Sequence, residues 1–131
     1  MEYSKFRMSI SAPSRHLAEK MADILSYRDP DFFLHRLCPL RISPIREESG
    51  KFVFDAEGVV ECSCNMLFSP GTPYDNECNP PGNAQMTTFP QLGKLAGIEV
   101  VCDAVNDTRG FSEHYEVDAS GLKDRKIVLW Q

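Results

Sequence analysis

The hydrophobic pattern of the chain changes period several times, and these changes limit the folds that it can adopt. Residues 5–11 alternate between apolar and polar side chains, which is typical of a half-buried strand. Residues 14–25 then place apolar side chains at helical spacing, with Ser11 or Ser14 as the N-cap and Pro13 near the first turn. A strand followed directly by an amphipathic helix indicates a fold that mixes both elements.

The next segments are predicted to be a short helix and then a hairpin. Asp29 and Pro30 open one or two helical turns through residue 37, and Pro39 ends them before an extended arm. Residues 51–66 alternate in two runs, joined by a hairpin turn at residues 56–58. This alternation would put four side chains on one face: Val60, Cys62, Cys64 and Met66.

The second half of the chain is predicted to hold a loop, a helix and further strands. Residues 69–87 indicate a long irregular loop. A short helix follows between Thr87 or Thr88 as the cap and Gly97 as the stop, with Leu92 and Leu95 facing inward. Strands are then expected in three segments: 98–105, 111–118 and 125–131.

This order of elements predicts an α+β fold in which two main helices cover one face of an antiparallel sheet. At 131 residues the chain is expected to form a single domain, residues 1–131, with one core. The sequence has neither a membrane-spanning apolar run nor a secretory signal, so we expect a cytoplasmic protein.

Alternation also assigns the acidic side chains to a face. If Ile98, Val100 and Cys102 face the helices, Glu99 and Asp103 face away from them. Apolar residues such as Val101 and Val105 would lie among the acids, as on protein-binding surfaces. The acids expected on this open face are Glu61, Glu99, Asp103, Glu116 and Asp118.

Charge is segregated along the sequence. Residues 47–118 carry thirteen acidic and three basic residues, whereas the whole chain has a net charge of -5. This argues for a basic protein partner and against direct binding of nucleic acid by the central region. The alternative is an acidic surface that is only solvated.

The cysteines allow a core role or a site. Cys62, Cys64 and Cys102 share the inward parity, and free cysteine packs as a small apolar side chain. The alternative is a zinc-binding or cysteine-dependent enzyme that uses Cys62, Cys64 and Cys78. The sequence has no phosphate loop, nucleophile elbow or zinc helix motif, so we expect no enzyme, no cofactor and no metal.

Three phrases resemble the ferredoxin-like-domain proteins of plasmids and phages typified by YubB. They are the aromatic-to-proline phrase at residues 31–40, the phrase at residues 71–76 and the helix-strand-turn-strand pattern at residues 89–117. In the second phrase Tyr74 stands where that family usually has Trp. The resemblance implies a ferredoxin-like fold and an origin in a mobile genetic element.

Charge and resemblance together predict a small phage- or plasmid-encoded binding protein of the host cytoplasm. It would inhibit a basic host protein, such as a CRISPR effector or another defence nuclease, by acting as an anti-CRISPR protein or nucleic-acid mimic. It would contact neither nucleic acid nor membrane directly, and a homo-oligomerisation module is a further alternative. The predicted partner-binding residues are Glu61, Tyr74, Asp75, Glu99, Asp103, Glu116 and Asp118.

Overall fold

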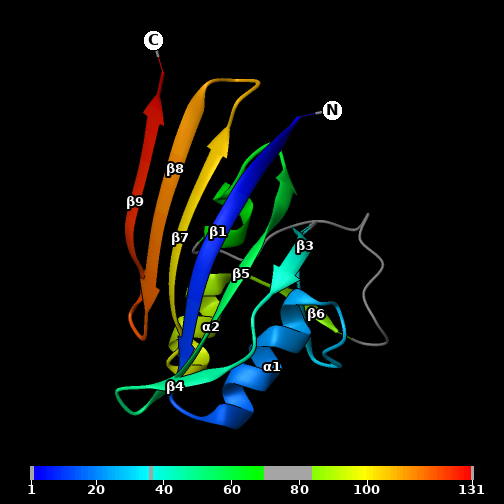
Figure 1. Cartoon of the computed structure of the whole chain (residues 1–131), viewed down its shortest axis with the longest axis vertical. Coiled ribbons are helices and arrows are strands. Elements are labelled where there is room, and N and C mark those ends of the chain that lie inside the picture. Colours follow the sequence, from blue (N-terminus) through cyan, green and yellow to red (C-terminus); the bar gives the residue numbers. More distant parts are fainter. Residues whose placement is uncertain (1, 36, 70–83, 131) are drawn as a thin grey trace.

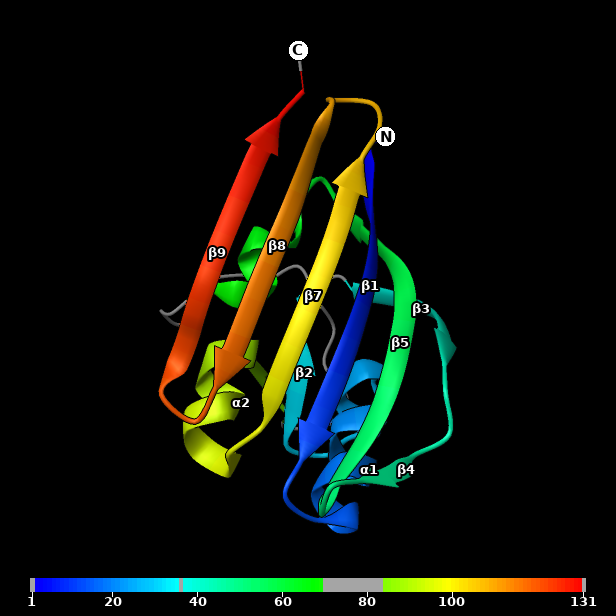
Figure 2. The ribbon, with the colours of Figure 1, turned by 60° about the vertical axis from the view of Figure 1, so that its left-hand side comes forward.

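The chain folds as an α+β protein in which helices cover one face of a large antiparallel sheet (Figure 1). The computed structural model describes residues 2–35, 37–69 and 84–130. The sheet has seven strands, in the order β3-β5-β1-β7-β8-β9, and β4 pairs with β5 beside β3. In Figure 2 the strands lie in front and both helices lie behind them, so one face of the sheet is open.

The first strand and helix follow the predicted pattern. β1 (Tyr3–Ala12) buries its even-numbered side chains, and α1 (Arg15–Leu25) begins after Ser14, whose Oγ accepts the amide of Leu17. Ser14 rather than Ser11 is therefore the N-cap. β1 lies at the centre of the sheet, antiparallel to β5 (Lys51–Glu61) on one side and to β7 (Glu99–Asn106) on the other.

The predicted helix at residues 29–37 is wrong. The Asp29 carboxylate accepts the amides of Asp31 and Phe32, which closes a local turn instead of starting a helix. The chain then forms β2 (Phe32–Leu34), which pairs in parallel with β6 (Gln85–Thr87), and β3 (Leu37–Ile42) at the sheet edge.

The predicted hairpin at residues 56–58 is also wrong, because β5 runs through it unbroken. Gly58 serves close packing: a Cβ there would lie 2.3 Å from the carbonyl oxygen of Cys38 on β3. The turn lies instead between β4 (Arg46–Glu48) and β5, where Ser49 and Gly50 both have positive φ. Positive φ at both central residues is the requirement of a tight hairpin turn.

The predicted alternation through residue 66 stops at Glu61. Cys62 has a φ of 63°, and Ser63 then caps a short 3-10 helix, η1 (Cys64–Phe68). The remaining prediction for this region, a loop over residues 69–87, lies mostly outside the described residues, although β6 forms its last part.

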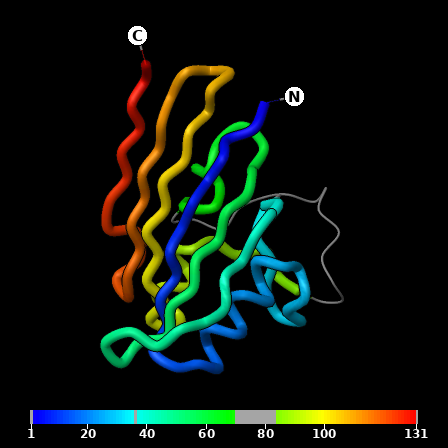
Figure 3. The backbone as a smooth tube through the Cα atoms, in the orientation of Figure 1, coloured from blue at the N-terminus to red at the C-terminus, as the bar shows by residue number. Residues whose placement is uncertain are grey.

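The second helix and the strand at residues 111–118 lie where the sequence predicts them, whereas the last strand begins at Gly121, four residues before its predicted start at residue 125. α2 (Phe89–Ala96) is capped by Thr88 and ends at Gly97 in the left-handed conformation. The inward placement of Leu95 is wrong, because that side chain is 68% exposed, whereas Leu92 is buried. β8 (Phe111–Asp118) and β9 (Gly121–Leu129) complete the sheet, and β9 ends at the same end as β1 begins (Figure 3).

The core lies between the inner face of the sheet and the helices. The ring of Phe68 from η1 stacks on Tyr115 of β8 and on Phe89 of α2, with centroids 4.3 and 5.0 Å away. These contacts attach η1 and α2 to the β8 side of the sheet. Among the described residues, no helix is long and apolar enough to cross a membrane.

Candidate functional site

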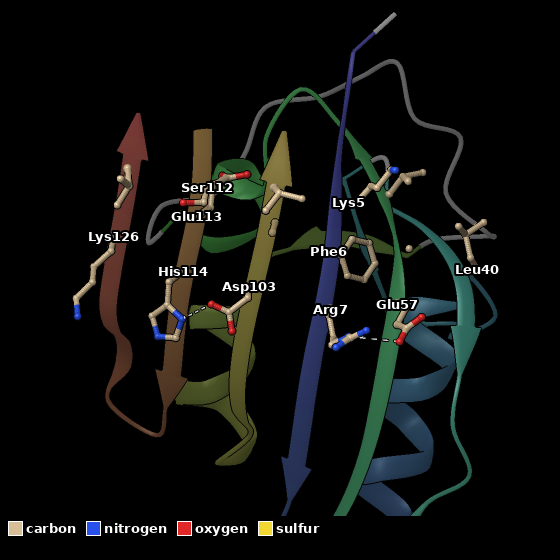
Figure 4. A pocket seen from close by; sticks show the side chains of 15 residues that line it. Lys5, Phe6, Arg7, Leu40, Glu57, Asp103, Ser112, Glu113, His114 and Lys126 are labelled. Carbon is tan, nitrogen blue, oxygen red and sulfur yellow. Dashed lines mark hydrogen bonds and ion pairs between the residues drawn. The ribbon is translucent and has the colours of Figure 1, made fainter. Parts of the chain in front are cut away.

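The open face of the sheet carries the candidate site, and the strand registers arrange its side chains in rows. One row, which we call the charged row, crosses six strands with mostly alternating sign. In Figure 4 its middle members lie side by side, and dashed lines join Arg7 to Glu57 and His114 to Asp103. Its members are Arg41, Glu57, Arg7, Asp103, His114 and Lys126.

A second row lies beside the charged row, toward the end of the sheet where β1 begins. It alternates apolar and polar side chains across five strands, and we call it the valine row. The valine row and the charged row without Arg41 line a shallow groove of about 670 Å³. The members of the valine row are Val59, Lys5, Val105, Ser112 and Val128.

On the other side of the charged row the face becomes acidic. Five carboxylates from three adjacent strands form what we call the acidic section, and Val101, which is 45% exposed, lies among them. Four of the five form ion pairs: Glu99 with Lys51, Asp103 and Glu116 with His114, and Asp124 with Lys126. The acidic section consists of Glu99, Asp103, Glu116, Asp118 and Asp124.

His114 is bound at both ring nitrogens. Its Nε2 lies 2.8 Å from Oε2 of Glu116, and its Nδ1 lies 2.7 Å from Oδ1 of Asp103. The hydrogen bond to Glu116 and then that to Asp103 raise the pKa of His114 above its usual range. The imidazolium therefore offsets part of the charge of the acidic section, and it links β7 to β8. His114 and Glu116 can meet because residues two apart on a strand share a face.

Among the described residues, this cluster also contains three side chains of the kinds that bind metal ions. Ligand atoms of His114, Glu116 and Asp124 lie within 4.8 Å of one another. A cation would need the Nε2 lone pair of a neutral His114, with Asp103 accepting from Nδ1. In the present geometry Nε2 of His114 faces the carboxylate of Glu116, so this nitrogen is already engaged within the protein.

On the opposite face, a buried carboxylate holds η1 against the sheet. Glu113 is 2% exposed and accepts hydrogen bonds from Ser63 Oγ at 2.5 Å, Cys64 N at 3.1 Å and Tyr115 Oη at 2.6 Å. Burial and the neighbouring carboxylate raise the pKa of Tyr115. The sequence does not predict this role of Glu113. The available signal is strand alternation, which places Glu113 on the face opposite that of His114.

The cysteines divide between surface and core. The predicted core position of Cys62 is wrong, because it lies exposed just after β5, where its positive φ turns the chain into η1. Cys64 and Cys102 are both buried. The pKa of Cys64 is raised, mainly by its hydrogen bond with Cys102 and secondly by burial. The alternative zinc or catalytic set included Cys78, which lies outside the described residues.

The structure brings together four of the predicted partner-binding residues and separates a fifth. Glu99, Asp103, Glu116 and Asp118 share the acidic section, and the structure adds Asp124 to them. Glu61 lies opposite Tyr3 at the far end of the sheet. Tyr74 and Asp75 lie outside the described residues.

Comparison with known proteins gives no match. No protein-family model matches the chain, and neither the curated proteins nor the solved structures contain a match to it. The geometry of the open face therefore carries the functional argument.

Proposed function

We propose that the chain is a binding protein, not an enzyme, that docks the acidic section of its open sheet face on a basic protein surface. The observation that carries this proposal is the gathering of Glu99, Asp103, Glu116, Asp118 and Asp124 on three neighbouring strands. Among the residues that the structure describes, no helix covers the side chains of the open face, so a partner can reach them.

The composition of the face favours a protein partner. Exposed Val101 lies within the acidic section, and exposed Val105 and Val128 lie in the valine row on the other side of the charged row. Apolar groups surrounded by charge provide area to bury, while the carboxylates select a basic partner and speed its approach. Arg7, a basic side chain of the charged row, is paired with Glu57 of the same row.

A nucleic-acid mimic is the most specific form of this proposal. The carboxylates gather negative charge on one face, as backbone phosphates present negative charge to a basic site. Such a protein would block a basic nucleic-acid-processing protein of a host, for example a CRISPR effector or another defence nuclease. The resemblance to the YubB-like family of plasmid and phage proteins supports this setting.

We further infer a ferredoxin-like fold at the centre of the sheet. Two strand-helix-strand units, β1-α1-β3 and β5-α2-β7, and the antiparallel strand order β3-β5-β1-β7 support this inference. The hairpin of β8 and β9 then extends the ferredoxin-like sheet beyond β7 and provides two of the three strands of the acidic section.

Affinity capture with paired charge-reversal variants tests the proposal. Immobilised wild-type protein should retain a basic protein from a bacterial lysate at low salt, and Glu99→Lys with Asp103→Lys should reduce the captured amount by about tenfold. The matched control reverses Lys5 and Arg7 to Glu, on the same face. If the control abolishes capture and the acidic variant does not, the acidic section is only a solvated surface.

A further inference from the structure

The outer edge of β9 is open to pairing. β9 spans nine residues and is the last strand of the sheet, and no strand among the described residues pairs with its outer side. The amide of Trp130 donates to the carbonyl of Gly110 at 2.7 Å, at the start of the β8–β9 ladder. Since backbone groups of an antiparallel strand alternate in direction, the N–H and C=O groups of Arg125, Ile127 and Leu129 point to the free edge.

The sequence of this edge is complementary to itself. If a second copy pairs its β9 antiparallel about a two-fold axis at Arg125, Asp124 lies opposite Lys126 of the second copy, and Lys126 lies opposite Asp124. Both are non-hydrogen-bonded positions of the new ladder, where opposing side chains approach most closely. Within one chain, Lys126 Nζ lies 3.7 Å from Oδ2 of Asp124, so both side chains lie together on the open face.

The charge pattern continues beyond this pair. On the open face the charged row of one copy ends in His114 and Lys126, and it would continue into Asp124 and Glu116 of the second copy. The same contact occurs twice because of the symmetry. At each of the two contacts, His114 and Lys126 of one copy therefore face Asp124 and Glu116 of the other, so unlike charges lie on opposite sides of the junction.

The other symmetric registers fit less well. A two-fold axis at Lys126 sets two lysines opposite each other, and an axis at Ile127 sets Lys126 opposite Val128 without an ion pair. An axis at Arg125 brings two arginines together on the helix side, but each guanidinium donates to Asn65 of its own chain at 3.2 Å. Each Arg125 side chain is thus already engaged within its own chain.

We propose that this chain forms a two-fold symmetric dimer through antiparallel pairing of β9 with β9 of a second copy, centred on Arg125. The two sheets then become one continuous sheet, and the two acidic sections lie on the same side of it. The dimer shares Asp124 with the acidic section, but its backbone contacts lie along the edge of the sheet, so a change of the β9 backbone tests it separately from the docking proposal.

Sedimentation equilibrium with charge-swap variants tests the dimer. The wild-type chain should dimerise reversibly between micromolar and millimolar concentrations. Asp124→Lys or Lys126→Asp alone should weaken the dimer by about tenfold, because each places like charges at two contacts. The double swap, Asp124→Lys with Lys126→Asp, should restore it, since the pairs reform with reversed sign.

A second variant tests the backbone contacts. Ile127→Pro removes an amide that points to the free edge and not to β8, so the monomer should keep its thermal unfolding midpoint while the dimer is lost. Lys5→Glu, inside the same open face, is the control and should leave the dimer unchanged. A wild-type chain that stays monomeric throughout, or a dimer that neither the single swaps nor the proline alters, would overturn the proposal.

Discussion

The carboxylate of Asp103 on β7 lies 2.7 Å from Nδ1 of His114 on β8, while Glu116 lies 2.8 Å from the other ring nitrogen. One imidazole thus joins two acids of the acidic section. The face that is proposed to attract a basic partner therefore carries a titratable positive charge at its centre. Its net charge becomes more negative when His114 loses its proton.

This arrangement makes stability depend on pH. The pKa of His114 in the folded chain is raised above its ordinary value of 6.5, so His114 stabilises the fold fully below that value. The contribution is lost as the pH rises through the folded pKa. Urea unfolding of wild type and His114→Gln from about pH 5.5 to pH 9 should show a difference below about 1 kcal/mol that shrinks with rising pH.

The alternative outcome for His114 is equally measurable. A difference between wild type and His114→Gln that grows with rising pH would mean that neutral His114 is the stabilising form. His16→Gln, a substitution on α1 away from this cluster, provides the control.

The buried Glu113 should be sensitive to a minimal change. Glu113→Gln keeps the shape of the side chain but replaces one acceptor oxygen by an amide donor, so one of the three donors around it loses its partner. We expect a loss of about 1–3 kcal/mol in the free energy of unfolding, measured by chemical denaturation.

The exposed Glu99→Gln serves as the matched control for Glu113. Its ion pair with Lys51 is solvated, so the change should cost less than about 1 kcal/mol. Equal losses in the two variants would contradict the anchoring role of Glu113.

Thiol reactivity should separate the cysteines by position. In the native chain, Cys38 and Cys62 are exposed and should be alkylated quickly, whereas Cys64 and Cys102 are buried and should react only after unfolding. Peptide mapping by mass spectrometry assigns each modified thiol. Fast labelling of Cys64 in the folded protein would show that η1 opens readily, contrary to its packing against Tyr115 and Glu113.

The sequence predicts the faces of the strands well but does not predict their register. Strict alternation is a local property, so the outward direction of Asp103, His114 and Glu116 follows from the sequence and agrees with the structure. The alignment of Arg7 between Glu57 and Asp103 is not local, because β1 must insert between β5 and β7. The charged row therefore cannot be predicted from the local sequence pattern.

The features that the sequence does not predict have physical causes that a local pattern does not reveal. A single residue with positive φ, Cys62, ends the alternation of β5 without a glycine to mark it. Conversely Gly58 resembles a turn residue but allows close approach of Cys38 within the sheet. Glu113 looks like a solvated acid because its partner Ser63 is fifty residues away in the sequence.

The last prediction concerns the rate at which the acidic section meets its partner. Long-range attraction between the five carboxylates and a basic surface should accelerate association, and added salt should slow it because the screening length falls to about 8 Å at physiological ionic strength. Neutralising Glu99 and Asp118 to Gln and Asn removes two of these charges while both sites stay exposed to solvent. The association rate with a captured partner, measured by stopped flow over a salt series, should then fall less steeply with salt than in wild type.

Dissociation rates should change little, since rim charges act mainly on encounter. Parallel salt series for the two proteins would mean that these carboxylates do not guide the encounter, and the apolar side chains of the valine row would then have to carry the binding.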